Sequence, residues 1–142
     1  MLQKEVEDKY NAMFDRERDM WVATVVMGYT PAETSLPAYP KVKHPDPQYH
    51  GLVIAVPNYT LHVEEAIKAL NQPLPNGGII AWEIQRLEGG YAVKYDSSGR
   101  RVYHKNLGDA ICLAAICARL VDEVDENDWT ESTQYFLSLI HI

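Results

Sequence analysis

The 142-residue sequence has only two cysteines, few basic residues and no long apolar run. Two cysteines cannot supply the disulfide framework of a small secreted domain, and Cys112 and Cys117 lie on different sides of one predicted helix. Both are expected to be reduced, buried thiols. The formal net charge of −7 argues against DNA or RNA as a partner, because such binding depends on Lys and Arg neutralising phosphates.

Segments that would target the chain to a membrane are also absent. No apolar run approaches the ~20 residues that a membrane span needs. The first ten residues, MLQKEVEDKY, lack the apolar centre of a signal peptide. No membrane partner is therefore predicted, and a cytoplasmic location is expected. A chain of this length can bury a core of its own, and one domain over residues 1–136 is expected.

Motifs that hold a metal or a cofactor are missing as well. The sequence contains no G-x-S-x-G, H-E-x-x-H or P-loop pattern. The spacing of its central histidines matches no zinc signature; these are His44, His50, His62 and His104. We predict no metal, no cofactor and no catalytic residue.

One pair of carboxylates, Glu83 and Asp96, falls on one face of the predicted sheet and would suit acid–base chemistry if it were buried. Lys94 and Arg101 lie beside them, which favours a solvated ladder of charges instead. The chain is therefore not expected to be an enzyme.

The segment from Gly78 to Val121 indicates the fold class. Alternating apolar and polar residues predict three antiparallel strands, followed by a helix that is apolar almost all round from Ala110 to Ala118. Such a helix is buried on more than one side, by another element or by a second subunit. We predict an α+β fold, a helix–sheet–helix (α/β/α) sandwich with an antiparallel three- to four-stranded sheet. A homo-oligomer formed through the apolar helix face is expected.

Turn residues set the register of these strands. With Gly89-Gly90 as the first two-residue loop, Ile84 opposes Tyr95, and with Ser98-Gly99 as the second, Tyr95 opposes Val102. One face then forms the core, with Ile80, Trp82, Ile84, Val93, Tyr95 and Val102. The other face is polar, with Glu83, Gln85, Lys94, Asp96, Arg101 and Tyr103, and pairs Asp96 with Arg101.

Helical spacing predicts one helix over residues 2–27, ended by Gly28. The stretch Thr30–Asn58 contains six prolines and reads as an extended arm with a short strand at Leu52–Val56. A loop of this length is typically functional or an interaction arm. Thr60 is predicted to cap a second helix that runs to Leu70.

The C-terminal part of the chain is acidic and then apolar. Residues 122–131 hold six acids and no base, which predicts a solvated helix end and tail. Residues 137–142, LSLIHI, resemble residue for residue the translation of a transposon adapter used in sequencing libraries. We expect a non-native tail there; the alternative is a chance apolar end.

Three short segments, in order, resemble the phage ABA sandwich domain family. They are VATVVMGY at Val22–Tyr29, PNYT at Pro57–Thr60 and AICLAA at Ala110–Ala115. The likeness covers about residues 20–121. Tyr29 stands where the family has Trp, and Leu61-His62 replace its acidic residue. The resemblance implies a helix–sheet–helix fold and a phage origin, hence the cytoplasm of an infected bacterial host. It implies no catalytic residues.

Basic and aromatic residues gather in the predicted strands and the arm. Between Ile79 and Lys105 five bases stand against three acids. A nucleotide needs both a π-face for its base and cations for its phosphates. The candidate ligand-binding residues are Arg86, Lys94, Arg100, Arg101, Tyr91, Tyr103, His104, Lys43 and His44, with Tyr95, Tyr39, Lys41 and Tyr49 nearby. The alternative is a solvated sheet face with ordinary cross-strand pairs.

Three functions follow from these features, in order of preference. The first is a phage-encoded, non-enzymatic accessory protein, in its most specific form an anti-defence sponge that sequesters a nucleotide-derived immune signal. The second is a protein–protein interaction module that acts on a phage or host protein through the proline-rich arm. The third is an enzyme built on Glu83, Asp96 and the histidines.

Overall fold

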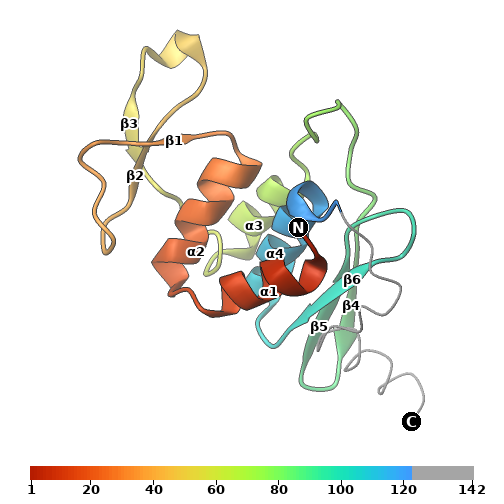
Figure 1. Ribbon diagram of the computed structural model, residues 1–142. Helices are drawn as coiled ribbons and strands as arrows, with labels where there is room; N and C mark the ends of the chain where they lie inside the picture. Colours follow the sequence, from red (N-terminus) through yellow and green to blue (C-terminus); the bar gives the residue numbers. More distant parts are fainter. Residues whose placement is uncertain (123–142) are drawn as a thin grey trace.

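A single apolar helix occupies the centre of the fold. The computed structural model describes residues 1–122, so most of the acidic run and the tail 137–142 lie outside the described residues. Helix α4 (Leu107–Leu120) packs against strands β5 (Gly90–Lys94) and β6 (Arg101–His104) and also against other helices (Figure 1). Its residues Ala110–Cys117 are at most 1% exposed. The predicted burial on more than one side is confirmed.

The elements that cover α4 belong to the same chain. Helix α1 (Gln3–Asn11), helix α3 (Val63–Leu70) and the π-helix η1 (Val22–Val26) all contact it. The apolar helix face that was expected to form an oligomer interface is therefore already covered within one chain. Both cysteines on this helix are free and buried, as predicted.

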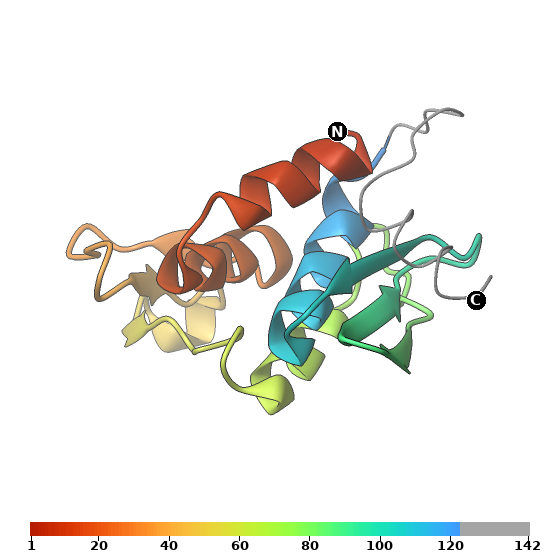
Figure 2. The same ribbon diagram turned by 90° about the horizontal axis from the view of Figure 1, so that it is seen from below.

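The predicted α+β class is confirmed. Two three-stranded antiparallel sheets have the orders β1-β2-β3 and β4-β5-β6. Figures 1 and 2 show these sheets at opposite ends of the molecule, with the helices between them. Within residues 1–122, no helix is long and apolar enough to cross a membrane.

The N-terminal helix is broken where the sequence predicted continuity. Helix α1 ends at Asn11, and α2 (Asp15–Trp21) follows after a short turn and leads directly into η1. The Glu17 carboxylate accepts a hydrogen bond of 3.2 Å from the Phe14 backbone N–H, which caps the new helix. The break redirects α2, so that one long apolar stripe becomes two differently oriented ones. Gly28 follows η1 with φ 74°, as expected of a C-terminal cap.

The proline-rich arm contains more regular structure than its sequence suggested. Strands β1 (Thr30–Pro31), β2 (Lys41–Lys43) and β3 (Val53–Ala55) form one small sheet, with a short 3₁₀ turn at Pro47–Tyr49. The strand predicted at Leu52–Val56 is confirmed, whereas β1 and β2 were missed. Pro40 and Pro45 lie close to the ends of β2, so its short alternation of polar and apolar residues was not recognised as a strand.

Helix α3 begins at Val63, later than predicted, with His62 at its N-cap. Thr60 does not cap it, because the Thr60 hydroxyl donates to Asp19 at 3.0 Å instead. The predicted end after Leu70 is confirmed.

The predicted register of the second sheet is wrong by one loop position at each turn. Strand β4 (Glu83–Leu87) pairs with β5 so that Ile84 opposes Val93, and Val93 in turn opposes Val102. The first loop is Glu88-Gly89, and Gly90 belongs to β5. A Cβ on Gly90 would lie 2.5 Å from the Tyr103 hydroxyl, so the strand needs glycine there.

The second loop is longer than predicted, and it changes one ion pair. Asp96 accepts hydrogen bonds from the Ser98 hydroxyl at 2.7 Å and from the Arg100 backbone N–H at 3.0 Å. Its ion-pair partner is Arg100, at 3.5 Å, and not Arg101. The predicted division into faces still holds, because Val93, Tyr95 and Val102 are buried.

Candidate functional site

The first turn of α4 holds a buried acid. Asn106 takes the N-cap position, and Asp109 lies in the first turn, where the helix dipole stabilises a negative charge. The Asn106 side-chain amide donates to Asp109 Oδ2 at 3.2 Å. Asp109 is only 3% exposed, so its charge needs further partners.

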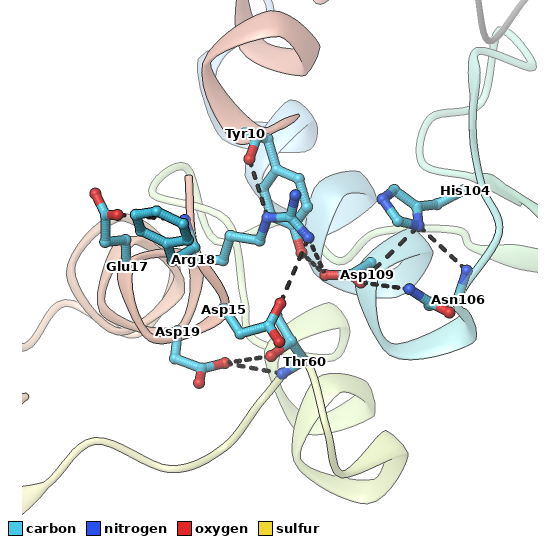
Figure 3. Close-up of polar contacts among 10 residues, drawn as sticks. Tyr10, Asp15, Glu17, Arg18, Asp19, Thr60, His104, Asn106 and Asp109 are labelled. Carbon is cyan, nitrogen blue, oxygen red and sulfur yellow. Dashed lines mark hydrogen bonds and ion pairs between the residues drawn. The ribbon is translucent and has the colours of Figure 1, made fainter. Parts of the chain in front are cut away.

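Those partners come from the N-terminal helices. The Tyr10 hydroxyl donates to Asp109 Oδ1 at 2.6 Å, and Arg18 Nη1 donates to the same oxygen at 3.2 Å (Figure 3). Arg18 Nε also donates to the Tyr10 carbonyl at 3.0 Å, which spans the break between α1 and α2. The Asp109 carboxylate is thus a paired charge that ties three helices together.

A second buried acid fixes the loop before α3. The Asp19 carboxylate accepts from the Thr60 backbone N–H at 2.9 Å and from its hydroxyl at 3.0 Å. Arg16 Nη1 donates to it at 2.7 Å. A Cβ on Gly108 would lie 2.1 Å from the Thr60 carbonyl oxygen, so only glycine lets this loop reach α4.

A cleft opens where this loop meets the start of α4. Its volume is about 500 Å³. Tyr91 supplies an aromatic side chain, Lys105 a cation, and Asp15 a second carboxylate beside Asp109. The lining residues are Asp15, Thr60, Leu61, Val63, Tyr91, Lys105, Asn106, Leu107, Gly108 and Asp109. A cleft lined in this way suits a small ligand that carries both an aromatic ring and a charge.

His104 adjoins this site, and its surroundings disfavour a positive charge on its ring. Burial lowers its pKa, and Arg18 and Lys105 lower it further, against the opposing effect of Asp109. Its Nδ1 accepts a hydrogen bond of 3.1 Å from the Asn106 backbone N–H, which requires that nitrogen to be unprotonated. Burial also raises the pKa of Tyr10, which therefore stays a neutral donor.

Three of the predicted ligand-binding residues lie in one row across the second sheet. Arg86 opposes Tyr91, and Tyr91 opposes His104. Because directly opposed residues share a face and faces alternate along a strand, this row points to the same side as Ile84. That is the side covered by α4, and Tyr91 reaches the cleft.

Other predicted residues lie on the opposite face. Lys94 opposes Arg101, and Tyr103 opposes Ala92, in the alternate rows. Arg100 is engaged with Asp96 in the turn. The sheet therefore separates Lys94, Arg101 and Tyr103 from Tyr91, and Asp96 holds Arg100 at the turn, so the predicted cluster is divided.

Lys43 and His44 lie farther still. Both belong to the arm, at the end of the molecule away from β4-β5-β6 (Figures 1 and 2). The His44 ring lies 4.2 Å from the Tyr49 ring and 5.3 Å from the Tyr29 ring, centroid to centroid. Within one chain, the structure therefore does not bring the basic and aromatic residues of the arm together with those of the second sheet.

The suggested acid–base pair is not assembled either. Glu83 is exposed and opposes Lys94, whereas the Asp96 carboxylate accepts a backbone hydrogen bond in the turn that follows β5. Among residues 1–122, no group of three or more His, Cys, Asp or Glu side chains could hold a metal ion.

A second hollow lies at the base of the arm. This apolar groove, of about 510 Å³, separates the arm from α2 and η1. Met20 and Trp21 form part of its floor, and Leu36 and Pro37 part of the arm wall. The full lining is Met13, Arg16, Glu17, Met20, Trp21, Thr24, Pro31, Ser35, Leu36, Pro37 and Pro40.

Sequence reasoning missed the residues that organise the cleft. Tyr10, Arg18 and Asp19 lie within one predicted amphipathic helix, where charged residues read as solvent-facing. Asp109 offered one usable signal, since an acid in the first turn of an otherwise apolar helix is favourable for the helix dipole. Its burial depends on contacts with residues about a hundred positions earlier.

Comparison with known proteins supports the fold alone. No protein-family model matches this sequence, and no curated protein matches it. The fold is similar to the 2.0 Å crystal structure of a phage protein from Bacillus cereus ATCC 14579, with a TM-score of 0.56 and 17% sequence identity. The match covers 75% of this chain and 88% of that one.

Proposed function

We propose that this chain is a phage-encoded accessory protein that acts without catalysis, by binding a protein partner through its proline-rich arm. The phage origin is supported by the fold shared with the Bacillus cereus phage protein. It is also supported by the likeness of Val22–Tyr29, Pro57–Thr60 and Ala110–Ala115 to the phage ABA sandwich domain family. The cytoplasm of an infected bacterial host is the proposed place of action.

The observation that carries this proposal is the apolar groove beneath the arm. Leu36 lines the groove and is 59% exposed. Exposed apolar patches on soluble proteins commonly mark interaction sites. A partner that inserts apolar side chains into the groove would bury Leu36 together with Met20 and Trp21.

The absence of catalysis is proposed because the buried acids are occupied. Asp109 is bound by Tyr10, Arg18 and Asn106, and Asp19 by Arg16 and Thr60. Carboxylates held in this way have a structural role in the fold, which is the reason to propose binding over acid–base chemistry.

Capture with single-residue variants tests the proposal. Wild-type protein, Leu36→Asp and Ile79→Asp are immobilised and exposed to lysate of infected host cells. Ile79 is a matched control, since it is 77% exposed and does not line the groove. A protein retained by wild type and Ile79→Asp but lost with Leu36→Asp supports the groove. Equal retention by all three contradicts it.

A second candidate function rests on the cleft at the start of α4. Tyr91 and Lys105 line it, and Arg86 lies directly across from Tyr91. This combination suits a small anionic ligand with an aromatic ring, such as a nucleotide. In its most specific form, the protein would sequester a nucleotide-derived immune signal of the host.

Calorimetric titration with cyclic ADP-ribose isomers and cyclic oligonucleotides tests this candidate. Binding should weaken in Tyr91→Ala and Lys105→Ala. Arg101→Ala is the control, because Arg101 lies on the opposite face of the sheet. Intact ligand should be released on denaturation; turnover would instead indicate an enzyme. No heat across the panel, or equal weakening by Arg101→Ala, would rule the cleft out.

A further inference from the structure

Strand β3 is the edge of the arm sheet and has no partner on its outer side among the described residues. The order β1-β2-β3 gives it one neighbour, β2. The segment Leu52–Val56 reads LVIAV, with neither a charge nor a proline. Leu52 is 52% exposed and Val53 43% exposed. Natural edges are usually protected by charges, prolines or bulges, so an exposed apolar edge calls for an explanation.

The hydrogen-bond pattern shows which backbone groups point outward. His44 N–H donates to the Leu52 carbonyl at 3.1 Å, and Val56 N–H donates to the Pro40 carbonyl at 3.0 Å. Pairing alternates along an antiparallel strand. The N–H and C=O groups of Val53 and Ala55 therefore face the free edge.

The other edge of the same sheet is closed to pairing. Strand β1 consists of Thr30 and Pro31, and a proline has no N–H to donate. Any strand that joins this sheet must therefore join at β3.

Charge favours a second copy of this chain as that strand. In the arm, residues 30–58, the two acids Glu33 and Asp46 balance the two bases Lys41 and Lys43. The rest of the chain then carries the whole net charge of −7. Two copies that each carry this net charge repel each other, and contact between their neutral arms carries less repulsion than contact between the charged remainders of the two chains.

We propose that two copies of this protein pair through antiparallel β3 strands about a two-fold axis. Val53 then opposes the partner's Ala55, and Ile54 opposes the partner's Ile54, so that every outward N–H and C=O in the strand is paired. The two arm sheets become one six-stranded sheet, β1-β2-β3 from each copy. The proposal goes beyond the proposed function, because it uses the strand edge and not the groove.

Sedimentation of wild type, Val53→Lys and Ile79→Lys over a concentration series tests the pairing. Wild type should show a monomer–dimer equilibrium. Val53→Lys should weaken dimerisation by about tenfold or more, because it places an ammonium group in an uncharged strand pair. Ile79→Lys, which removes an exposed apolar side chain outside the arm, should leave dimerisation unchanged.

The predicted register allows a rescue. In Val53→Lys/Ala55→Glu, each new ammonium faces the partner's new carboxylate, and dimerisation should recover relative to Val53→Lys alone. Circular dichroism establishes that each variant is folded. A wild type that is monomeric at every concentration overturns the proposal, and so does a dimer indifferent to Val53→Lys.

A measurement on wild type alone covers the case in which Val53→Lys does not fold. Hydrogen exchange at the Val53 and Ala55 amides should slow as protein concentration rises, because dimer formation pairs them. Exchange at the backbone amide of Gly77, an exposed residue outside the arm, serves as the internal reference. Exchange at Val53 and Ala55 that is independent of concentration, in a protein that does dimerise, overturns the proposal.

Discussion

The Tyr10 hydroxyl donates a 2.6 Å hydrogen bond to the buried carboxylate of Asp109, joining α1 to α4 across 99 positions of sequence. Arg18 binds the same oxygen from α2. The three helices are therefore positioned by one charged group. A buried carboxylate that loses a partner costs more than an ordinary hydrogen bond contributes, so this contact should be sensitive to small changes.

Tyr10→Phe should lower the free energy of unfolding by about 1–3 kcal/mol, because Asp109 loses a buried donor. Asp109→Asn should cost about 3–5 kcal/mol, since it leaves the Arg18 guanidinium without its buried counter-charge. Denaturant unfolding measures both. Tyr39→Phe is the control for Tyr10→Phe, because Tyr39 is 72% exposed. Equal effects of the two Tyr→Phe changes would contradict this account.

Gly108→Ala should destabilise the protein by at least about 1–3 kcal/mol, the usual cost of overpacking. The new methyl group would meet the Thr60 carbonyl, which outweighs the gain in helix propensity. Gly78→Ala is the matched control, since its nearest contact is the end of the Asn76 side chain. Thermal unfolding of the two variants should differ clearly, and a neutral Gly108→Ala would show that the loop can retreat.

Stability should fall as the pH drops below about 6.5, the ordinary pKa of histidine. Because burial lowers the pKa of His104 in the folded protein, the unfolded chain takes up this proton first. The contribution is fully present above that pH and is lost as the pH falls through the folded-state pKa. Unfolding free energies across this range should show a smaller slope in His104→Gln than in wild type.

A disulfide between strands can verify the register of β4 and β5. Glu83→Cys/Lys94→Cys should close on oxidation, because these positions are directly opposed. Glu83→Cys/Asp96→Cys would be the opposed pair in the register expected from a Gly89-Gly90 loop, and it should stay reduced. Thiol titration and intact mass distinguish the two outcomes. Closure of the second pair would show that the register predicted from the sequence is correct.

Cys112 and Cys117 should be unreactive towards thiol reagents in the folded protein. Burial raises the pKa of both thiols, so neither forms an accessible thiolate. Reaction with a chromogenic disulfide should appear only on unfolding, with the denatured protein as reference. Rapid labelling of either residue in the native state would show that α4 is not enclosed.

The strand pattern predicted the faces of the second sheet although its register was wrong. A shift of a two-residue loop by one position changes the sum of opposed residue numbers by two, so parity and face are preserved. Val93 and Val102 therefore stay in the core in either register. Ion pairs depend on the register itself, which is why Asp96 was assigned to Arg101 and not to Arg100.

The candidate site was predictable only in part, because residue type does not reveal position. Tyr91 was among the predicted ligand-binding residues and lines the cleft. Lys43 shares the chemistry of Lys94 but lies in another sheet. Arg18 looks like any solvent-facing base of an amphipathic helix. Its role depends on Asp109, which no local pattern connects to it.

The central position of α4 has a consequence for synthesis on the ribosome. The helix is the last element in the described part of the chain, yet α1, α3, η1 and the second sheet all pack against it. Until Leu107–Leu120 has left the exit tunnel, these surfaces have nothing to cover them. The nascent chain cannot complete this core before α4 is available. A ribosome stalled upstream of Leu107 would therefore hold a polypeptide with exposed apolar surfaces, which are prone to aggregate and are typical substrates of chaperones.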